Sequence, residues 1–238
     1  REDLVRQSLY RLELIDPTNP DVIAARFRYL LRQGDSAGAQ KQLDRLQELA
    51  PDSSALRDSR GIMTLSTPEG RQALQEARLQ GTTGHTQEAI AAYDKLFNGN
   101  PPPGEIAREY WVQVAKLPAR RNEAINQLKA LNARRPGDGE LQNALAQLLF
   151  ASDRPDEGYA VLQQMAKSGT SRNAAAAIWY QQIKDLPVSD ASVQALQRFL
   201  AQFSEGDNVE MARQQLAEQQ QKLADPAFRA RSQGLAAV

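Results

Sequence analysis

The feature that most constrains this chain is a pattern of spacings that recurs along it. In each copy an alanine lies five residues after a glycine, two large residues follow after four and then three more positions, and a proline comes five residues later. The full copies are Gly34, Ala39, Leu43, Leu46, Pro51 and Gly84, Ala89, Tyr93, Leu96, Pro101. Incomplete copies are Ala119, Ala124, Leu128, Leu131, Pro136 and Asp153, Gly158, Leu162, Met165.

Each position in the pattern has a physical role. Glycine permits the positive φ of a turn between two helices, and the small residue lets paired helices approach closely. The large residues share one face of an amphipathic helix, which proline ends. These are second-helix positions of the tetratricopeptide repeat, which is about 34 residues long. We therefore predict an all-α fold, a right-handed superhelix (α-solenoid) of tetratricopeptide hairpins.

The repeats predict one solenoid over residues 1–238, with the first repeats in 1–51, an irregular segment in 52–69 and further repeats in 70–238. The chain ends match parts of repeats. The front match to a second helix is Val5, Leu9, Leu12 and Pro17, and the back match to a first helix is Ala230, Gln233, Gly234 and Ala237. We therefore expect a fragment of a longer array, with its last repeat truncated.

The stretch between the two full copies is about half a repeat too long. Its apolar residues at helical spacing are Leu56, Ile62, Met63 and Leu65. We predict an extra, unpaired helix over residues 53–65, where the superhelix changes direction, with Gly61, Pro68 and Gly70 as a candidate hinge. The alternative is a ragged insert packed on the convex side.

The residues needed for catalysis are scarce. There is no cysteine, which excludes thiolate metal sites, disulfides and thiol catalysis. The single histidine, His85, lies in a predicted turn without partners for a catalytic triad or a two-histidine metal site. We expect no enzyme activity, no catalytic residue, no cofactor and no metal. A glycosidase, which would need two facing carboxylates, is a third hypothesis.

Charge and hydropathy exclude two further classes of ligand. Lys and Arg total 29, as do Asp and Glu, so the chain has no long-range field to attract nucleic acid. No apolar run approaches the roughly 20 residues that span a bilayer. We expect no nucleic-acid partner.

Two aromatic pairs, Tyr110-Trp111 and Trp179-Tyr180, start segments that resemble each other at an offset of 69 residues. The later copy predicts a second helix over residues 190–203. In one interpretation Trp111 and Tyr180 fill the core. In the other, Tyr110 and Trp179 reach the groove and stack on a sugar or a peptide.

The concave face of such a solenoid is lined by first helices, and it is where a ligand is expected. The repeat frame also places Leu31, Leu74 and Phe150 there. The candidate binding residues are Arg28, Arg32, Arg71, Arg78, Glu109, Gln113, Asn143, Gln147 and Gln182. The face is thus predicted to be basic early and amide-rich late. Its arginines are expected to clamp carboxylates by paired hydrogen bonds. The alternative is a merely solvated face.

Several phrases are more specific than the repeat. They are "RQSLYRLELIDPTNPDV", "RQGDSAGAQKQLDRLQELAP", "YWVQVAKLPARRNEAINQLK" and "LADPAFRARSQGLAAV". With them, essentially the whole chain resembles the amino-terminal tetratricopeptide-repeat region of the bacterial cellulose synthase operon protein C family.

The resemblance implies a periplasmic repeat array, followed in the full-length protein by an outer-membrane β-barrel that is absent here. It implies a role in cellulose export, in which the repeats link the inner-membrane synthase complex to the exit pore. The lack of cysteine and of an initiator Met at Arg1 fits a cloned periplasmic fragment whose signal peptide is gone.

We therefore expect a non-catalytic scaffold whose partners are periplasmic parts of the cellulose synthase complex. The alternative is direct glycan binding by the concave face, to nascent β-1,4-glucan or to peptidoglycan.

Overall fold

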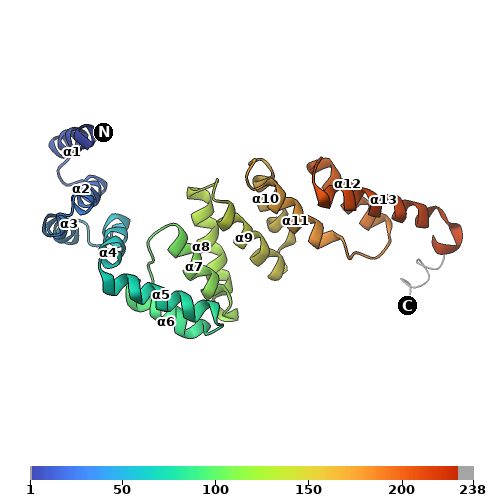
Figure 1. The fold of residues 1–238 in the computed structure, drawn as a ribbon, viewed down its shortest axis with the longest axis horizontal. Coiled ribbons are helices and arrows are strands. Elements are labelled where there is room, and N and C mark those ends of the chain that lie inside the picture. Colours follow the sequence, from blue (N-terminus) through green and yellow to red (C-terminus); the bar gives the residue numbers. More distant parts are fainter. Residues whose placement is uncertain (1, 230–238) are drawn as a thin grey trace. The chain divides into compact units, whose positions relative to one another are not determined.

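The computed structural model describes residues 2–229, and within them the chain is helical without any strand (Figure 1). Contacts divide the chain into two compact units, residues 1–124 and 125–238. The helices of the first unit are α1 (Glu2–Ile15), α2 (Pro20–Arg32), α3 (Ser36–Leu49), α4 (Ser54–Ser66), α5 (Pro68–Thr82), α6 (Thr86–Phe97), α7 (Glu105–Ala115) and η1 (Pro118–Arg120).

The boundary between the units falls inside α8 (Arg121–Arg134). The helices of the second unit are α9 (Gly139–Ala151), α10 (Pro155–Ala166), α11 (Arg172–Ile183), α12 (Asp190–Gln202) and α13 (Asp207–Ala224). The predicted partial helix at Ala230, Gln233, Gly234 and Ala237 lies outside the described residues.

Helical hairpins build both units, as the repeat pattern predicts. The most extensive pairings are α2 with α3, α5 with α6, and α9 with α10. Gly34 and Gly84 occupy the turns with φ of 78° and 86°, and Asp153 adopts φ 56° at the turn between α9 and α10. The small residues Ala39 and Ala89 are fully buried. An all-α, tetratricopeptide-like solenoid is therefore the fold of this chain.

Close approach of α9 and α10 explains a departure from the alanine pattern. Gly158 lies against the ring of Phe150, where an added Cβ would be 2.8 Å from the ring carbon Cζ. The large positions that follow, Leu162 and Met165, are fully buried. Glycine thus serves here as the small residue because an aromatic side chain takes up the remaining space.

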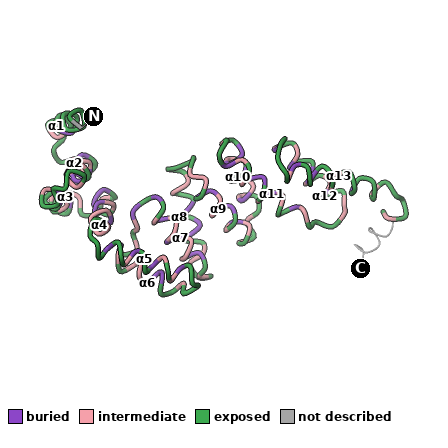
Figure 2. Tube along the Cα trace, viewed as in Figure 1, coloured by how far each residue is buried: buried purple, intermediate pink, exposed green. Residues whose placement is uncertain are grey.

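Helix α1 carries the predicted apolar stripe but buries only part of it. Leu9 is buried, whereas Val5 and Leu12 are exposed (Figure 2). Among the described helices, α1 makes its main contact with α2 alone. No first helix therefore covers the rest of its stripe within residues 2–229.

The predicted extra helix is α4, which packs on α2, α3, α5 and α6. Its buried face differs from the predicted one. Leu56 is buried, but Ile62, Met63 and Leu65 are only half-buried, and Ala55, Ser59 and Gly61 take the buried positions. The face turns because α4 contacts helices on both sides instead of one hairpin partner.

A single residue, Thr67, joins α4 to α5. Its hydroxyl donates to the carbonyl of Thr64 over 2.9 Å and accepts from the backbone N–H of Gly70 over 3.1 Å. Thr67 thereby caps both helices, and Pro68 follows at the first turn of α5, where its missing N–H costs nothing. The connection is short and fully hydrogen-bonded.

The candidate hinge residues surround this junction. Gly61 and Gly70 are both buried. A Cβ on Gly61 would lie 3.1 Å from the ring of Pro102, and one on Gly70 would collide with the carbonyl oxygen of Thr64. Both glycines thus allow close packing, and a hinge motion at this point stays a prediction.

Candidate functional site

The nine candidate binding residues all lie on first helices of hairpins, and we call them the first-helix face. They lie on α2 (Arg28, Arg32), α5 (Arg71, Arg78), α7 (Glu109, Gln113), α9 (Asn143, Gln147) and α11 (Gln182). The structure describes their positions and contacts. Their role in binding stays a prediction.

The exposed basic part of this face is on α2. Arg28 and Arg32 are one helical turn apart and exposed. Within residues 2–229, neither of them has a hydrogen bond or an ion pair. Their guanidinium groups are therefore available to an anionic group of a partner.

Arg71 is occupied within the chain. Its guanidinium donates to the carbonyl oxygens of Leu65 and Ser66, over 3.3 Å and 2.7 Å. These carbonyls end α4, where positive charge is favourable because the helix dipole places partial negative charge there. Arg71 thus stabilises the junction of α4 and α5.

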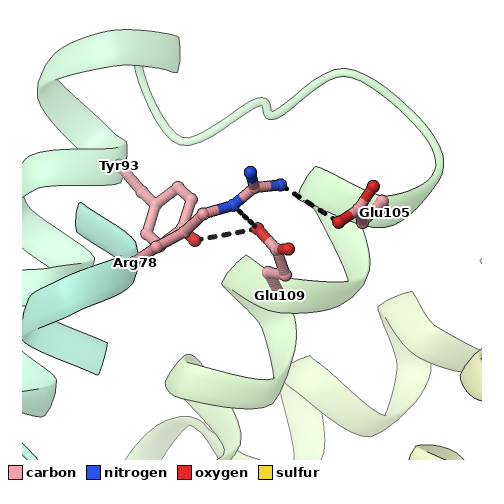
Figure 3. Close-up of polar contacts among 4 residues, drawn as sticks. All are labelled: Arg78, Tyr93, Glu105 and Glu109. Atoms are coloured by element: carbon pink, nitrogen blue, oxygen red, sulfur yellow. Dashed lines mark hydrogen bonds and ion pairs between the residues drawn. The ribbon is translucent and has the colours of Figure 1, made fainter. Parts of the chain in front are cut away.

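Arg78 and Glu109 pair with each other across α5 and α7 (Figure 3). The Arg78 Nε donates to Glu109 Oε2 over 2.9 Å, and its Nη2 reaches Glu105 Oε1 at 3.2 Å. The Tyr93 hydroxyl, from α6, donates to the same Glu109 oxygen over 3.1 Å. Three helices are thereby tied together by one carboxylate.

The protonation of this cluster follows from its contacts. The hydrogen bond to Glu109 raises the pKa of Arg78, so the guanidinium stays charged. Burial, and then the negative charge of Glu109, raises the pKa of Tyr93. Two carboxylates surround one guanidinium, so this part of the face is not basic. The predicted basic character belongs to Arg28 and Arg32 instead.

Amide side chains on the face make short-range contacts. Lys116 donates to Gln113 Oε1 over 2.8 Å and reaches the carbonyl of Gly81 at 3.4 Å. Gln147 donates to Asn143 over 2.7 Å. Gln182 is exposed, without a polar partner among the described residues. Of the three apolar residues placed on the face, Leu74 is buried, and Leu31 and Phe150 are half-buried.

The stacking interpretation of Tyr110 and Trp179 is wrong, because both side chains are buried. The Tyr110 hydroxyl donates to Asp94 over 2.8 Å, and its ring packs edge-on against Trp111 at 4.8 Å between centroids. Burial, with this hydrogen bond, raises the pKa of Tyr110 to about 12. Tyr180, expected in the core, is half-buried and donates to Gln215.

The second unit holds a pocket of about 280 Å³ on α10, α11 and α12. Tyr159 and Trp179, with ring centroids 4.9 Å apart, form its aromatic wall. Its polar lining comes from Asp156, Gln163 and Arg198, none of which has a polar partner within residues 2–229. Burial raises the pKa of Tyr159. Sequence reasoning missed this pocket, because its residues come from three helices.

Neither a membrane span nor a metal site is found among residues 2–229. No helix there is long and apolar enough to cross a membrane. In the same part of the chain, no three histidine or acidic side chains come together in a group that could hold a metal ion.

No family model matches the chain. It is 76% identical over all 238 residues to cellulose synthase operon protein C of Salmonella typhimurium, and 71% identical over the same length to that of Escherichia coli K12. It is 32% identical over 83% of its length to cellulose synthase 1 operon protein C of Komagataeibacter xylinus. The chain spans about a fifth of the first two relatives.

A solved structure agrees with these relatives. A crystal structure of the flexible tandem repeat domain from bacterial cellulose synthase matches this chain with a TM-score of 0.80 and 72% identity. The match covers 94% of this chain and 93% of that one. On its sequence identity over the full length and on its fold, the chain belongs to the cellulose synthase operon protein C family.

Proposed function

We propose that this chain is a non-catalytic scaffold for protein–protein interaction in bacterial cellulose synthesis and export. In this proposal it lies in the periplasm, and its first-helix face binds periplasmic parts of the synthase complex, linking them to the outer-membrane pore. Family membership supports the process, and the helical hairpins support the scaffold role, because such arrays present extended surfaces of side chains.

The observation that carries the proposal is the pair of exposed arginines on α2. Arg28 and Arg32 have no partner among residues 2–229, unlike Arg71 and Arg78, which bind groups of the chain itself. Guanidinium groups bind carboxylates with paired hydrogen bonds, so this end of the face suits an acidic partner surface.

Photo-crosslinking in cells tests the proposal. A photoreactive amino acid at position 28, 147 or 182 is expected to trap the same set of periplasmic proteins of the synthase complex, identified by mass spectrometry. The matched controls are Gln87 and Gln197, which are exposed on the second helices α6 and α12. Equal capture from the control positions would remove the first-helix face from the proposal.

A second candidate function is direct glycan binding, which the pocket on α10, α11 and α12 favours. Aromatic side chains with free carboxylate, amide and guanidinium groups can contact a sugar ring and its hydroxyls together. The ligand in this proposal is β-1,4-glucan or peptidoglycan. The pocket, and not Tyr110 or an exposed Trp179, would provide the contacts.

Fluorescence titration distinguishes this second candidate. In the variant Trp111→Phe, Trp179 is the only tryptophan of the chain. Cello-oligosaccharides at millimolar concentration are expected to shift its emission, and Asp156→Asn with Arg198→Gln to weaken that response. Malto-oligosaccharides of equal length are the control ligand. An unchanged emission spectrum would count against glycan binding at this pocket.

A further inference from the structure

A basic pocket of about 310 Å³ lies in the first unit, away from the first-helix face. Its lining comes from α3, α4, α6 and the residues that follow α6. Three cationic side chains border it: Arg57 and Arg60 from α4 and Lys95 from α6. No aspartate or glutamate is among its lining residues.

The three cations are not neutralised by the described part of the chain. Arg57 donates to the backbone carbonyl of Asp52 over 2.7 Å, and Arg60 donates to the side-chain amide oxygen of Gln47. Both acceptors are uncharged. Lys95 has no hydrogen bond or ion pair within residues 2–229. This arrangement contrasts with Arg78, whose charge two carboxylates compensate.

Local structure holds the cations on one side of the pocket. Arg57, Arg60 and Gly61 share a face of α4 because they are three and four residues apart. Gly61 lets the segment after α6 approach α4, since a Cβ there would lie 3.1 Å from the ring of Pro102. That segment brings the amide side chains of Asn98 and Asn100 to the pocket.

The end of α6 is closed by its own chain. The backbone N–H of Asn98, which has φ 50°, donates to the carbonyl of Asp94 over 2.7 Å. The backbone N–H of Asn100 donates to the carbonyl of Phe97 over 2.9 Å. Two of the helix-end acceptors are thus satisfied, which reduces their competition with an incoming anion.

The remaining lining is apolar. It includes Leu43, Met63, Leu96 and Phe97. A free phosphate would use the cations and leave this wall in water. A peptide that carries both carboxylates and apolar side chains would use both, because burial of apolar surface adds to the charged hydrogen bonds.

We propose that this pocket binds an acidic segment of a protein partner, with its carboxylates on Arg57, Arg60 and Lys95 and its apolar side chains against Met63 and Leu96. The inference rests on the proposed scaffold function but names a second surface. Its failure would leave crosslinking from position 28, 147 or 182 unchanged. Loss of those crosslinks would likewise leave binding at this pocket unchanged.

Fluorescence anisotropy with a labelled peptide tests the inference. The probe is an octapeptide in which Glu alternates with Leu, and it is expected to bind the whole 238-residue chain. The variant Arg60→Glu with Lys95→Glu should weaken binding about tenfold or more, since each position loses a charged hydrogen bond. The matched control, Arg135→Glu with Lys222→Glu, makes the same charge change at exposed positions and should bind like the parent chain.

Three further arms make the result specific. Circular dichroism checks that helicity is retained, and Arg60→Gln with Lys95→Gln removes the charges without reversing them and should also weaken binding. Peptides with Gln in place of Glu, or Ser in place of Leu, should bind more weakly than the probe. Equal loss in the control variant, or equal binding of either altered peptide, overturns the inference. Binding of inorganic phosphate without binding of the peptide overturns it as well.

Discussion

Replacing Trp179 with alanine is expected to unfold the second unit locally and to leave the first unit folded. Trp179 is buried and lies among Tyr159, at 4.9 Å, and Phe203, at 5.8 Å between ring centroids. Removing a buried aromatic side chain costs about 3–5 kcal/mol, because transfer energy is lost and a cavity is left. In repeat folds each hairpin is stabilised by its neighbours, so the loss should stay near α10, α11 and α12.

Hydrogen exchange resolved by mass spectrometry measures this effect. Backbone amides of α10, α11 and α12 should lose protection in Trp179→Ala, whereas those of α2 and α3 should keep it. Trp111→Ala is the mirrored control, because Trp111 is similarly buried in the first unit. That variant should lose protection near α7 and keep it near α11. Uniform loss over both units in either variant would show that the chain unfolds as one body.

The fold could be predicted because its signals are local in the sequence. Gly34 and Gly84 are needed for positive φ, and Ala39 and Ala89 are needed for close approach of two helices. Each requirement concerns residues within one hairpin. The extra helix was predictable for the same reason, since the stretch between two full copies of the pattern must form some structure of its own.

The buried face of α4 was not predictable, because it depends on four neighbouring helices. The apolar stripe placed Ile62, Met63 and Leu65 inward, whereas the structure buries Ser59 and Gly61. Small residues lie inward where Pro102, more than 40 positions later in the chain, packs closely. Hydropathy within one helix contains no signal for such a contact.

The candidate site was predictable in position but not in chemistry. The repeat frame placed Arg78 and Glu109 on first helices, as observed. That they pair with each other depends on the packing of α5 against α7 and on Tyr93 from α6. Adjacent aromatic residues were ambiguous because each pair spans two helix faces. Tyr110 is buried through its hydrogen bond to Asp94, a partner 16 positions earlier.

Strong alkali is expected to destabilise the first unit through Tyr93 and Tyr110. Burial is the main cause that raises the pKa of both side chains, to about 12 for Tyr110. In the unfolded chain a tyrosine loses its proton near pH 10, so between about pH 10 and pH 12 the unfolded state binds fewer protons than the folded state. The stabilising contribution is therefore complete below about pH 10 and is lost as the pH rises through this window.

The expected size follows from linkage. Each of the two tyrosines should lower the free energy of unfolding by about 1.4 kcal/mol per pH unit in this window. Urea unfolding followed by circular dichroism at several pH values measures the slope. The double variant Tyr93→Phe with Tyr110→Phe should have a flatter slope, while Tyr10→Phe, at an exposed position, should keep that of the parent chain.

The same double variant should also be less stable than the parent near neutral pH. It removes the hydrogen bonds to Glu109 and Asp94, each worth about 1 kcal/mol or somewhat more because the acceptors are charged. The two stability curves should therefore start apart and converge as the pH rises above about 10, because the parent alone loses the tyrosine contribution. Parallel curves across this range would show that neither hydroxyl is held neutral by the folded chain, and the cluster around Glu109 would then be open to water.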